Sequence, residues 1–230
     1  MEILIMIFKR MLSAIPALFG VLLITFILTR ALPGDPAAYL AGPAASMEAV
    51  EQIRKELGLD KNMFDQFIVY IKDIAHGNLG NSWATGRPVL TELIDRLPAS
   101  IEMTLLGLFI SIVIALPLGV ISATRPGSWI DHFGRAITTL GVSLPYFVTG
   151  LILVFVFYYL LNWFPAPMGR LPLFAPTPTY YTGFFLIDTL IARDFGMFLE
   201  SARHVFLPSL TLAIFALAPI ARMTRASMLG

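Results

Sequence analysis

The sequence predicts an all-α protein, a polytopic bundle of transmembrane helices with a helical segment outside the membrane. Of its 230 residues, 57% are hydrophobic and only 13% are charged. The mean hydropathy of +0.78 lies well above the range of soluble globular proteins. Four long apolar stretches, 11–29, 103–124, 136–161 and 205–221, hold no formal charge, and each approaches the roughly 20 residues that cross a bilayer as a helix. The four predicted spans are residues 11–30, 102–124, 136–161 and 205–221.

The first span, residues 11–30, follows an N-terminal segment, 1–10, that ends in Lys9 and Arg10. A cleaved signal peptide is the alternative, because it too begins with basic residues and continues with an apolar run. The run here is longer than the usual ~7–15 residues, and residues 29–31 do not form a small-x-small cleavage site. We therefore expect an uncleaved first helix.

Positive charges predict the orientation of the chain. They collect in residues 1–10, in the link 125–135 between spans two and three, and in residues 222–230 after span four. Because cytoplasmic loops are enriched in Lys and Arg, these three places are predicted to be cytoplasmic. Segments 31–101 and 162–204 then lie on the opposite side, and segments of that length translocate largely regardless of charge.

The first outer segment, 31–101, has the pattern of folded helix. Apolar residues recur at helical spacing over 47–57 and 62–75, with Gly58 as a stop between them. We expect two short amphipathic helices outside the membrane. They either cap the bundle or contact a partner, and the sequence favours neither role.

The second outer segment, 162–204, is rich in proline over its first half, which excludes a helix across the membrane. Trp163, Tyr180 and Tyr181 are residue types that favour the headgroup layer. We expect this half to run along the outer interface. Helical spacing returns over 188–204 before the fourth span.

Proline and small residues recur inside the spans. Each proline removes a backbone donor and tends to kink its helix, which suits a moving pathway, although packing alone accounts for many such prolines in membranes. The prolines are Pro16, Pro117, Pro145, Pro208 and Pro219. Small residues allow helices to approach closely. Those noted are Gly20, Gly107, Gly119, Gly141, Gly150, Ser111, Ser143 and Thr149.

Several classes of function lack their sequence signature. No basic run or basic and aromatic interleaving indicates nucleic-acid binding. Cysteine is absent, and the three histidines have no carboxylate or second histidine at metal-ligand spacing. The chain has no G-x-x-x-x-G-K phosphate loop, no H-E-x-x-H zinc pair and no G-x-S-x-G nucleophile elbow. We therefore expect no enzymatic activity, metal site or cofactor in this chain.

Charged residues are missing from the interior of all four predicted spans. Proton-coupled and ion-coupled carriers usually keep such a group near the midplane of the membrane. A secondary carrier is therefore disfavoured, although helices beyond this sequence could hold the group. A membrane scaffold or anchoring subunit without a pathway is the other alternative, because it would use the same spans for packing alone.

Six short stretches along the chain resemble the signatures of one family. They are 30–36 (RALPGDP), 56–60 (ELGLD), 77–82 (GNLGNS), 96–102 (RLPASIE), 207–212 (LPSLTL) and 221–229 (ARMTRASML). Each stretch alone is weak, but the combination covers essentially the whole chain. The sequence thus resembles the dipeptide, oligopeptide and nickel permease family of ABC importers, and most of all the first of its two permease subunits.

The resemblance implies a division of labour. Two permeases pair as a heterodimer to form one pathway for short peptides, which opens alternately to the two sides of a bacterial inner membrane. Two cytoplasmic ATPase subunits, with ATP and Mg²⁺, supply the energy. An extracytoplasmic binding protein delivers the substrate. Dipeptides, oligopeptides, glutathione and nickel chelates all remain possible substrates.

Family members have six spans and a cytoplasmic EAA loop that contacts the ATPase. This sequence stops at Gly230, so the resemblance implies either a fragment or a truncated product. It also implies that Arg222, Thr224 and Arg225 belong to the approach to the EAA loop.

Polar residues of spans two to four are the candidates for lining the pathway. The alternative for each of them is a hydrogen bond between helices. They are Ser111, Ser143, Thr149 and Ser209.

Overall fold

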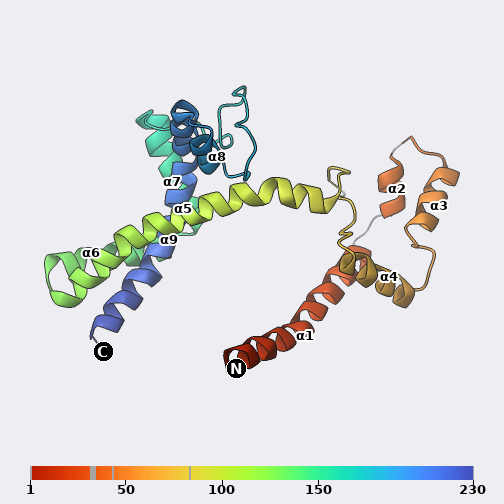
Figure 1. The fold of residues 1–230 in the computed structure, drawn as a ribbon, viewed down its shortest axis with the longest axis horizontal. Helices are drawn as coiled ribbons and strands as arrows, with labels where there is room; N and C mark the ends of the chain where they lie inside the picture. Colours follow the sequence, from red (N-terminus) through yellow and green to blue (C-terminus); the bar gives the residue numbers. More distant parts are fainter. Residues whose placement is uncertain (1, 32–34, 43, 83, 230) are drawn as a thin grey trace. The chain divides into compact units, whose positions relative to one another are not determined.

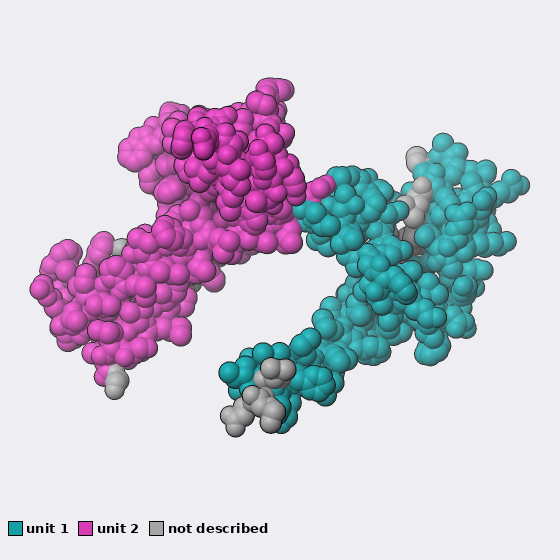
Figure 2. All heavy atoms as spheres, viewed as in Figure 1, with its two compact units in different colours: residues 1–94 teal, residues 95–230 magenta. Residues whose placement is uncertain are grey.

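The structure, a computed structural model, describes residues 2–31, 35–42, 44–82 and 84–229. Apart from one isolated bridge between Asn81 and Pro88, every regular element in these ranges is a helix (Figure 1). The chain divides into two units, residues 1–94 and residues 95–230, which are coloured separately in Figure 2. Each unit is described by itself.

Unit 1 begins with one long helix, which is followed by three short ones. These are α1 (Glu2–Ala31), α2 (Pro36–Ala41), α3 (Met47–Glu56) and α4 (Met63–Ala75). The two helices predicted in the first outer segment are therefore present. Ser46 and Asn62 cap their N-termini through side-chain oxygens, and Gly58 has the left-handed φ of +63° that ends the first of them.

Helix α1 is long and apolar enough to cross a membrane over Ile5–Arg30. This stretch begins six residues before the predicted span 11–30. The added turns contain Lys9 and Arg10, whose long side chains can reach the membrane surface from a helix end. Aromatic contacts join α1 to α4. The ring centroids of Phe26 and Phe67 are 5.2 Å apart, and those of Phe26 and Tyr70 are 5.6 Å apart.

Unit 2 contains most of α5 and all later helices. They are α5 (Val89–Thr124), α6 (Trp129–Ser143), α7 (Tyr146–Leu153), the π-helix η1 (Val154–Leu160), α8 (Phe185–Ile191) and α9 (Phe195–Leu229). By length and composition α5 and α9 could each cross a membrane. Both begin before the predicted spans at 102 and 205, so each span continues a helix that starts outside it.

The predicted span 136–161 is divided in the structure. Helix α6 ends at Ser143, Leu144 is extended with ψ of 138°, and α7 starts after Pro145. Proline causes this break, because its ring disfavours the helical conformation of the preceding residue and it has no N–H to continue the ladder. The apolar part that follows, Tyr146–Leu160, has 15 residues and is partly a π-helix.

Helices α5 and α9 pack along two stripes of mostly small residues at four-residue spacing. On α5 the buried residues are Gly107, Ser111, Ala115, Gly119 and Ala123. On α9 they are Ser201, Val205, Ser209, Ala213, Leu217 and Ala221. We call this contact the α5–α9 seam. Residues four apart lie on one helix face, and small side chains there let two backbones approach.

Two glycines show how close the seam is. A Cβ atom at Gly107 would lie 2.7 Å from the carbonyl oxygen of Ser209. A Cβ atom at Gly119 would lie 2.9 Å from the carbonyl oxygen of Ala221. From the first contact to the second, the residue number increases by twelve on α5 and by twelve on α9, which corresponds to about 18 Å along each helix. The two helices therefore run in the same direction.

The chain between them returns in the opposite direction along α9. Asp131 of α6 pairs with Arg225, a Cβ atom at Gly150 would lie 3.3 Å from Thr211, and the ring of Phe164 stacks on Phe206 at 5.0 Å. The position on α9 thus falls as the residue number on the returning chain rises. The broken segment α6–α7–η1 therefore runs antiparallel to α9. A span that connects two parallel spans must run in this direction.

We predict that Gly107→Leu will destabilise unit 2 by about 1–3 kcal/mol, because its side chain must displace the α9 backbone. Gly20→Leu is the matched control, since among the described residues nothing lies within 4 Å of a Cβ atom there. Thermal unfolding of the purified chain in detergent measures both. An effect at position 20 as large as that at position 107 would contradict a close seam.

Candidate functional site

One end of unit 2 is held by a cluster of charges that we call the Asp131 cluster. It consists of Asp131 and Arg135 of α6, Arg225 of α9 and the amide of Gly127. Asp131 is 1% exposed, and its Oδ2 accepts a hydrogen bond of 3.0 Å from the Gly127 N–H. Arg135 lies 3.2 Å from Oδ2, and Arg225 Nε lies 3.4 Å from Oδ1. One buried carboxylate therefore joins two helices and the link before them.

The local sequence explains why Asp131 sits there. Ser128 caps α6, and its hydroxyl oxygen accepts the Asp131 N–H at 3.3 Å. Ser-x-x-Asp is a capping pattern, and an acidic group in the first turn is favoured by the helix dipole. This pattern was the sequence signal that could have revealed Asp131, which lies inside the predicted loop 125–135.

The Asp131 carboxyl is held in its charged form. The hydrogen bond from the Gly127 amide lowers its pKa below the ordinary value; burial opposes this, and the charges of Arg135 and Arg225 add to the lowering. Two cations share one anion, so the cluster keeps an excess of positive charge. That excess agrees with the predicted cytoplasmic location of this end.

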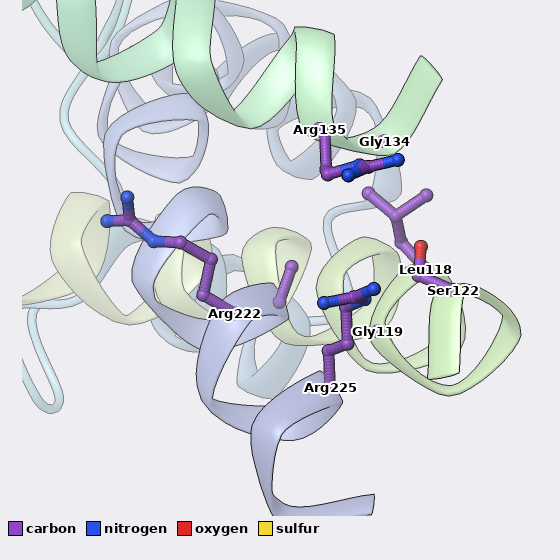
Figure 3. A pocket seen from close by; sticks show the side chains of 8 residues that line it. Leu118, Gly119, Ser122, Gly134, Arg135, Arg222 and Arg225 are labelled. Carbon is purple, nitrogen blue, oxygen red and sulfur yellow. The ribbon is translucent and has the colours of Figure 1, made fainter. Parts of the chain in front are cut away.

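A small crevice opens beside the cluster between α5, α6 and α9 (Figure 3). Arg135 enters the view from α6 and Arg225 from α9, whereas Arg222 extends away from the other labelled side chains. Thr224 packs its Cβ against Gly119, and its hydroxyl donates to the Ile220 carbonyl at 2.9 Å. Of the three residues predicted to approach the EAA loop, Arg225 is thus bound to α6, Thr224 lies in the seam, and Arg222 lines the crevice.

The four candidate pathway residues fall into two places. Ser111 and Ser209 are fully buried in the α5–α9 seam, and their hydroxyl oxygens have no hydrogen-bond partner within the described part of the chain. Ser143 ends α6 and donates to the Thr139 carbonyl at 2.7 Å. Thr149 is half-buried on α7, so these two residues flank the break at Leu144 and Pro145.

A second polar group, which we call the Glu102 network, joins α5 to the segment before and within α8. Glu102 is 5% exposed. One of its oxygens lies 3.2 Å from Arg170, and the other accepts the Leu186 N–H at 2.7 Å. Arg170 also donates to the Gly183 carbonyl at 2.8 Å, and its guanidinium lies 3.5 Å from the ring centroid of Phe185. The irregular segment is therefore tied to α5 by a buried ion pair.

Asp188 organises the turn next to this ion pair. It is 1% exposed and accepts three hydrogen bonds, from the N–H and hydroxyl of Thr182 and the N–H of Gly183, at 2.6–2.9 Å. Burial raises its pKa, but these hydrogen bonds outweigh burial and the pKa is lowered. Gly183 has φ of +84°, and a Cβ there would lie 3.0 Å from Pro98. Sequence patterns did not reveal the Glu102 network, because Arg170 and Leu186 are far from Glu102 in the chain.

We predict that Asp131→Asn will lower the thermal unfolding midpoint by several degrees, because two guanidinium groups would lose their shared anion. Asp65→Asn is the matched control. Asp65 occupies the same third position of α4 behind the cap Asn62, but it is exposed. Equal effects of the two variants would mean that Asp131 contributes only helix capping.

We also predict that acid will loosen the turn at Asp188. Because its pKa is lower in the folded than in the unfolded state, its contribution is fully present above pH ~4 and is lost as pH falls through the folded pKa. Hydrogen exchange of the Thr182 and Gly183 amides, corrected for intrinsic rates, measures this directly. Asp188→Asn should remove the acid dependence, whereas Asp194→Asn, at an exposed carboxyl, should leave it. Acid-independent protection in the unsubstituted chain would contradict the prediction.

Comparison with known proteins places the chain in a family. A family model described as the N-terminal part of a binding-protein-dependent transport system membrane component matches residues 3–104. A second, described as a binding-protein-dependent transport system inner membrane component, matches residues 115–230.

Three curated relatives match nearly the whole chain. A probable D,D-dipeptide transport system permease protein of Escherichia coli K12 is 43% identical over 91% of it. A di/tripeptide transport system permease protein of Pseudomonas aeruginosa is 40% identical over 96%, and a dipeptide transport system permease protein of Alkalihalophilus pseudofirmus is 36% identical over 96%. The chain spans less than two thirds of their own lengths, from 62% to 66%. With both family models and these relatives in agreement, the chain belongs to the family of binding-protein-dependent transport system inner membrane components.

Proposed function

We propose that this chain is the transmembrane part of a permease subunit of an ATP-driven importer of short peptides. It forms part of the translocation pathway, which opens alternately to the two sides of the membrane, while separate subunits hydrolyse ATP. The observation that carries the proposal is the 36–43% identity to relatives named as dipeptide or di/tripeptide permeases. The chain itself acts as a transport subunit and not as an enzyme.

The geometry of unit 2 supports a transport role over a purely packing one. Discontinuous helices at membrane depth leave backbone groups without helical partners, and they are tolerated where they are buried in protein or line a cavity. The break between α6 and α7, followed by a π-helix, is such a discontinuity. Ser143 and Thr149 flank it, so they are the better candidates for the pathway, whereas Ser111 and Ser209 contribute to the seam in the conformation described.

The proposed orientation places the Asp131 cluster at the cytoplasmic end of unit 2. The N-terminus and residues 222–230 face the cytoplasm of a bacterium, and segments 31–101 and 162–204 face outward from its inner membrane. The Asp131 cluster then fixes α9 to α6 next to the approach to the EAA loop. Movement of an ATPase bound to that loop would pass through α9 to the helices packed on it.

The proposed partners are those of a binding-protein-dependent importer. A second permease forms the heterodimer, two cytoplasmic ATPase subunits hold ATP and Mg²⁺, and an extracytoplasmic binding protein delivers the peptide. No cofactor is assigned to this chain.

The proposal is tested by dipeptide uptake into proteoliposomes that contain the full-length permease and its operon partners. We predict uptake that needs the binding protein and internal ATP, that vanadate abolishes and that a protonophore leaves intact. An ATP-independent uptake that the protonophore abolishes would instead indicate a secondary carrier. No uptake of any peptide by a fully assembled complex would favour a scaffold.

A variant tests the task of the Asp131 cluster in the same assay. Asp131→Asn should lower the ATP-dependent uptake rate severalfold, while the complex still assembles. Asp65→Asn should leave the rate unchanged. Undiminished uptake by Asp131→Asn would show that coupling does not pass through the cluster.

A further inference from the structure

Within unit 1, helix α4 lies against the C-terminal half of α1 (Figure 1). Three aromatic contacts fix its level there. The ring centroid of Phe67 is 5.7 Å from that of Phe19 and 5.2 Å from that of Phe26. The ring centroids of Tyr70 and Phe26 are 5.6 Å apart.

This level corresponds to the inside of a bilayer leaflet. The candidate span Ile5–Arg30 has 26 residues, or about 39 Å, which matches the thickness of a bilayer with its headgroup layers. Arg30 then lies among the headgroups, and the hydrocarbon begins roughly 6 Å below it. Along the helix, Phe26 is about 6 Å and Phe19 about 16 Å from Arg30. Phe67 therefore lies at the depth of acyl chains, between these two levels.

Helix α4 runs across α1 rather than along it. Met63 lines a cavity together with Arg30. Tyr70, two turns later on α4, contacts Phe26. Both ends of this stretch of α4 thus lie near the same end of α1, and the depth of a side chain depends on the face of α4 that carries it.

The contacts of α4 show which of its faces points toward the membrane centre. Gln66 lines the cavity at the end of α1. Tyr70 contacts Phe26, and Phe67 also reaches Phe19. With 3.6 residues per turn, Gln66, Tyr70 and Phe67 follow one another over roughly 100° of the helix surface. Rotation in this direction therefore leads from the end of α1 toward the membrane centre.

The next residues in that direction are apolar. Ile71, Phe64 and Ile68 occupy the following roughly 100° of the helix surface. Phe64 is 71% exposed and Ile68 is 36% exposed. The face of α4 that points toward the membrane centre is therefore apolar and accessible, as in amphipathic helices that lie in a membrane interface.

The charged residues of α4 fit the same placement. Asp73 is exposed and lies on the opposite side of the helix from Phe64, toward water. Asp65 and Lys72 are exposed on the flank away from α1, between the two faces. Asp65 is hydrogen-bonded to the cap Asn62, and a lysine side chain can extend from this flank to the headgroups.

The size of the exposed side chains favours acyl chains over another helix as their neighbours. Contacts between helices in a membrane are enriched in small residues, which let the backbones approach. The α5–α9 seam has this composition, with Gly107, Ser111 and Ala115 on α5. The exposed face of α4 presents phenylalanine and isoleucine instead, and bulky apolar side chains suit insertion into the acyl boundary.

We propose that α4 is an interfacial helix in the leaflet at the Arg30 end of α1, with Phe64 and Ile68 inserted among phospholipid acyl chains. In the proposed orientation this is the outer leaflet. The sequence alone predicted a helix outside the membrane, because its spacing does not reveal the depth of the contact with α1. The inference rests on the membrane crossing of α1, which the proposed function includes, and is independent of the transported substrate.

The test measures the depth of spin labels on single introduced cysteines, since the sequence has none of its own. Phe64→Cys and Ile68→Cys place a label on the proposed lipid face, and Asp73→Cys places it on the opposite face. Ile24→Cys, at a position of α1 that is 60% exposed, is the depth reference. The variants are made in the full-length permease, assembled with its partner subunits in liposomes, after any cysteine outside this sequence is replaced by serine.

Collisions of each label with oxygen, which concentrates among acyl chains, are compared with collisions with a nickel chelate that stays in water. We expect the ratio of oxygen to nickel collisions at positions 64 and 68 to exceed that at position 73 severalfold and to approach that at position 24.

A ratio at positions 64 and 68 as low as that at position 73, with a high ratio at position 24, would overturn the proposal and leave α1 as a span. Immobilised labels at 64 and 68 that collide weakly with both reagents would overturn it in favour of a contact with another helix. A low ratio at position 24 as well would contradict the membrane crossing of α1, and the proposed function with it.

Discussion

The backbone contact between α5 and α9 sets the geometry of unit 2. In lipid, apolar side chains gain little by leaving one apolar environment for another, so helices associate through close packing. Gly107 and Gly119 provide that packing at two levels, where a single added carbon atom would meet a carbonyl of α9. Since the returning segment α6–α7–η1 packs against α9, its position depends on this contact.

Buried charges complete the bundle at both ends. Asp131 at one end and Glu102 at the other are each nearly inaccessible, and each is compensated by arginine and backbone donors. A buried carboxylate without such partners would cost several kcal/mol. Both carboxylates connect elements that are separate in sequence, so they hold the irregular parts of the unit to its long helices. Close packing thus fixes the distance between α5 and α9. The ion pairs hold the segments that connect these helices against them.

The sequence predicted the helical class, the spans near α1, α5 and α9, and the two short helices α3 and α4, because these depend on local periodicity and capping. Small residues at Gly107, Gly119 and Gly150 were correctly expected at close helix contacts, whereas Gly20 faces open space. The division at Leu144 could be foreseen only as a kink at Pro145. The capping pattern of Ser128 could have indicated Asp131, but its pairing with Arg225 and the Glu102 network could not be predicted, since these partners are brought together only by tertiary structure. For the same reason the pathway residues remain a prediction.

The Glu102 network also bears on the order in which unit 2 is completed. Glu102 and Arg170 are 68 residues apart, and chains are made from the N-terminus, so α5 is synthesised well before its compensating cation. Glu102 begins the predicted span 102–124, so until Arg170 emerges its carboxylate can stay in water at the outer end of α5. The carboxylate becomes buried only when the segment before α8 has been translated and has folded onto α5.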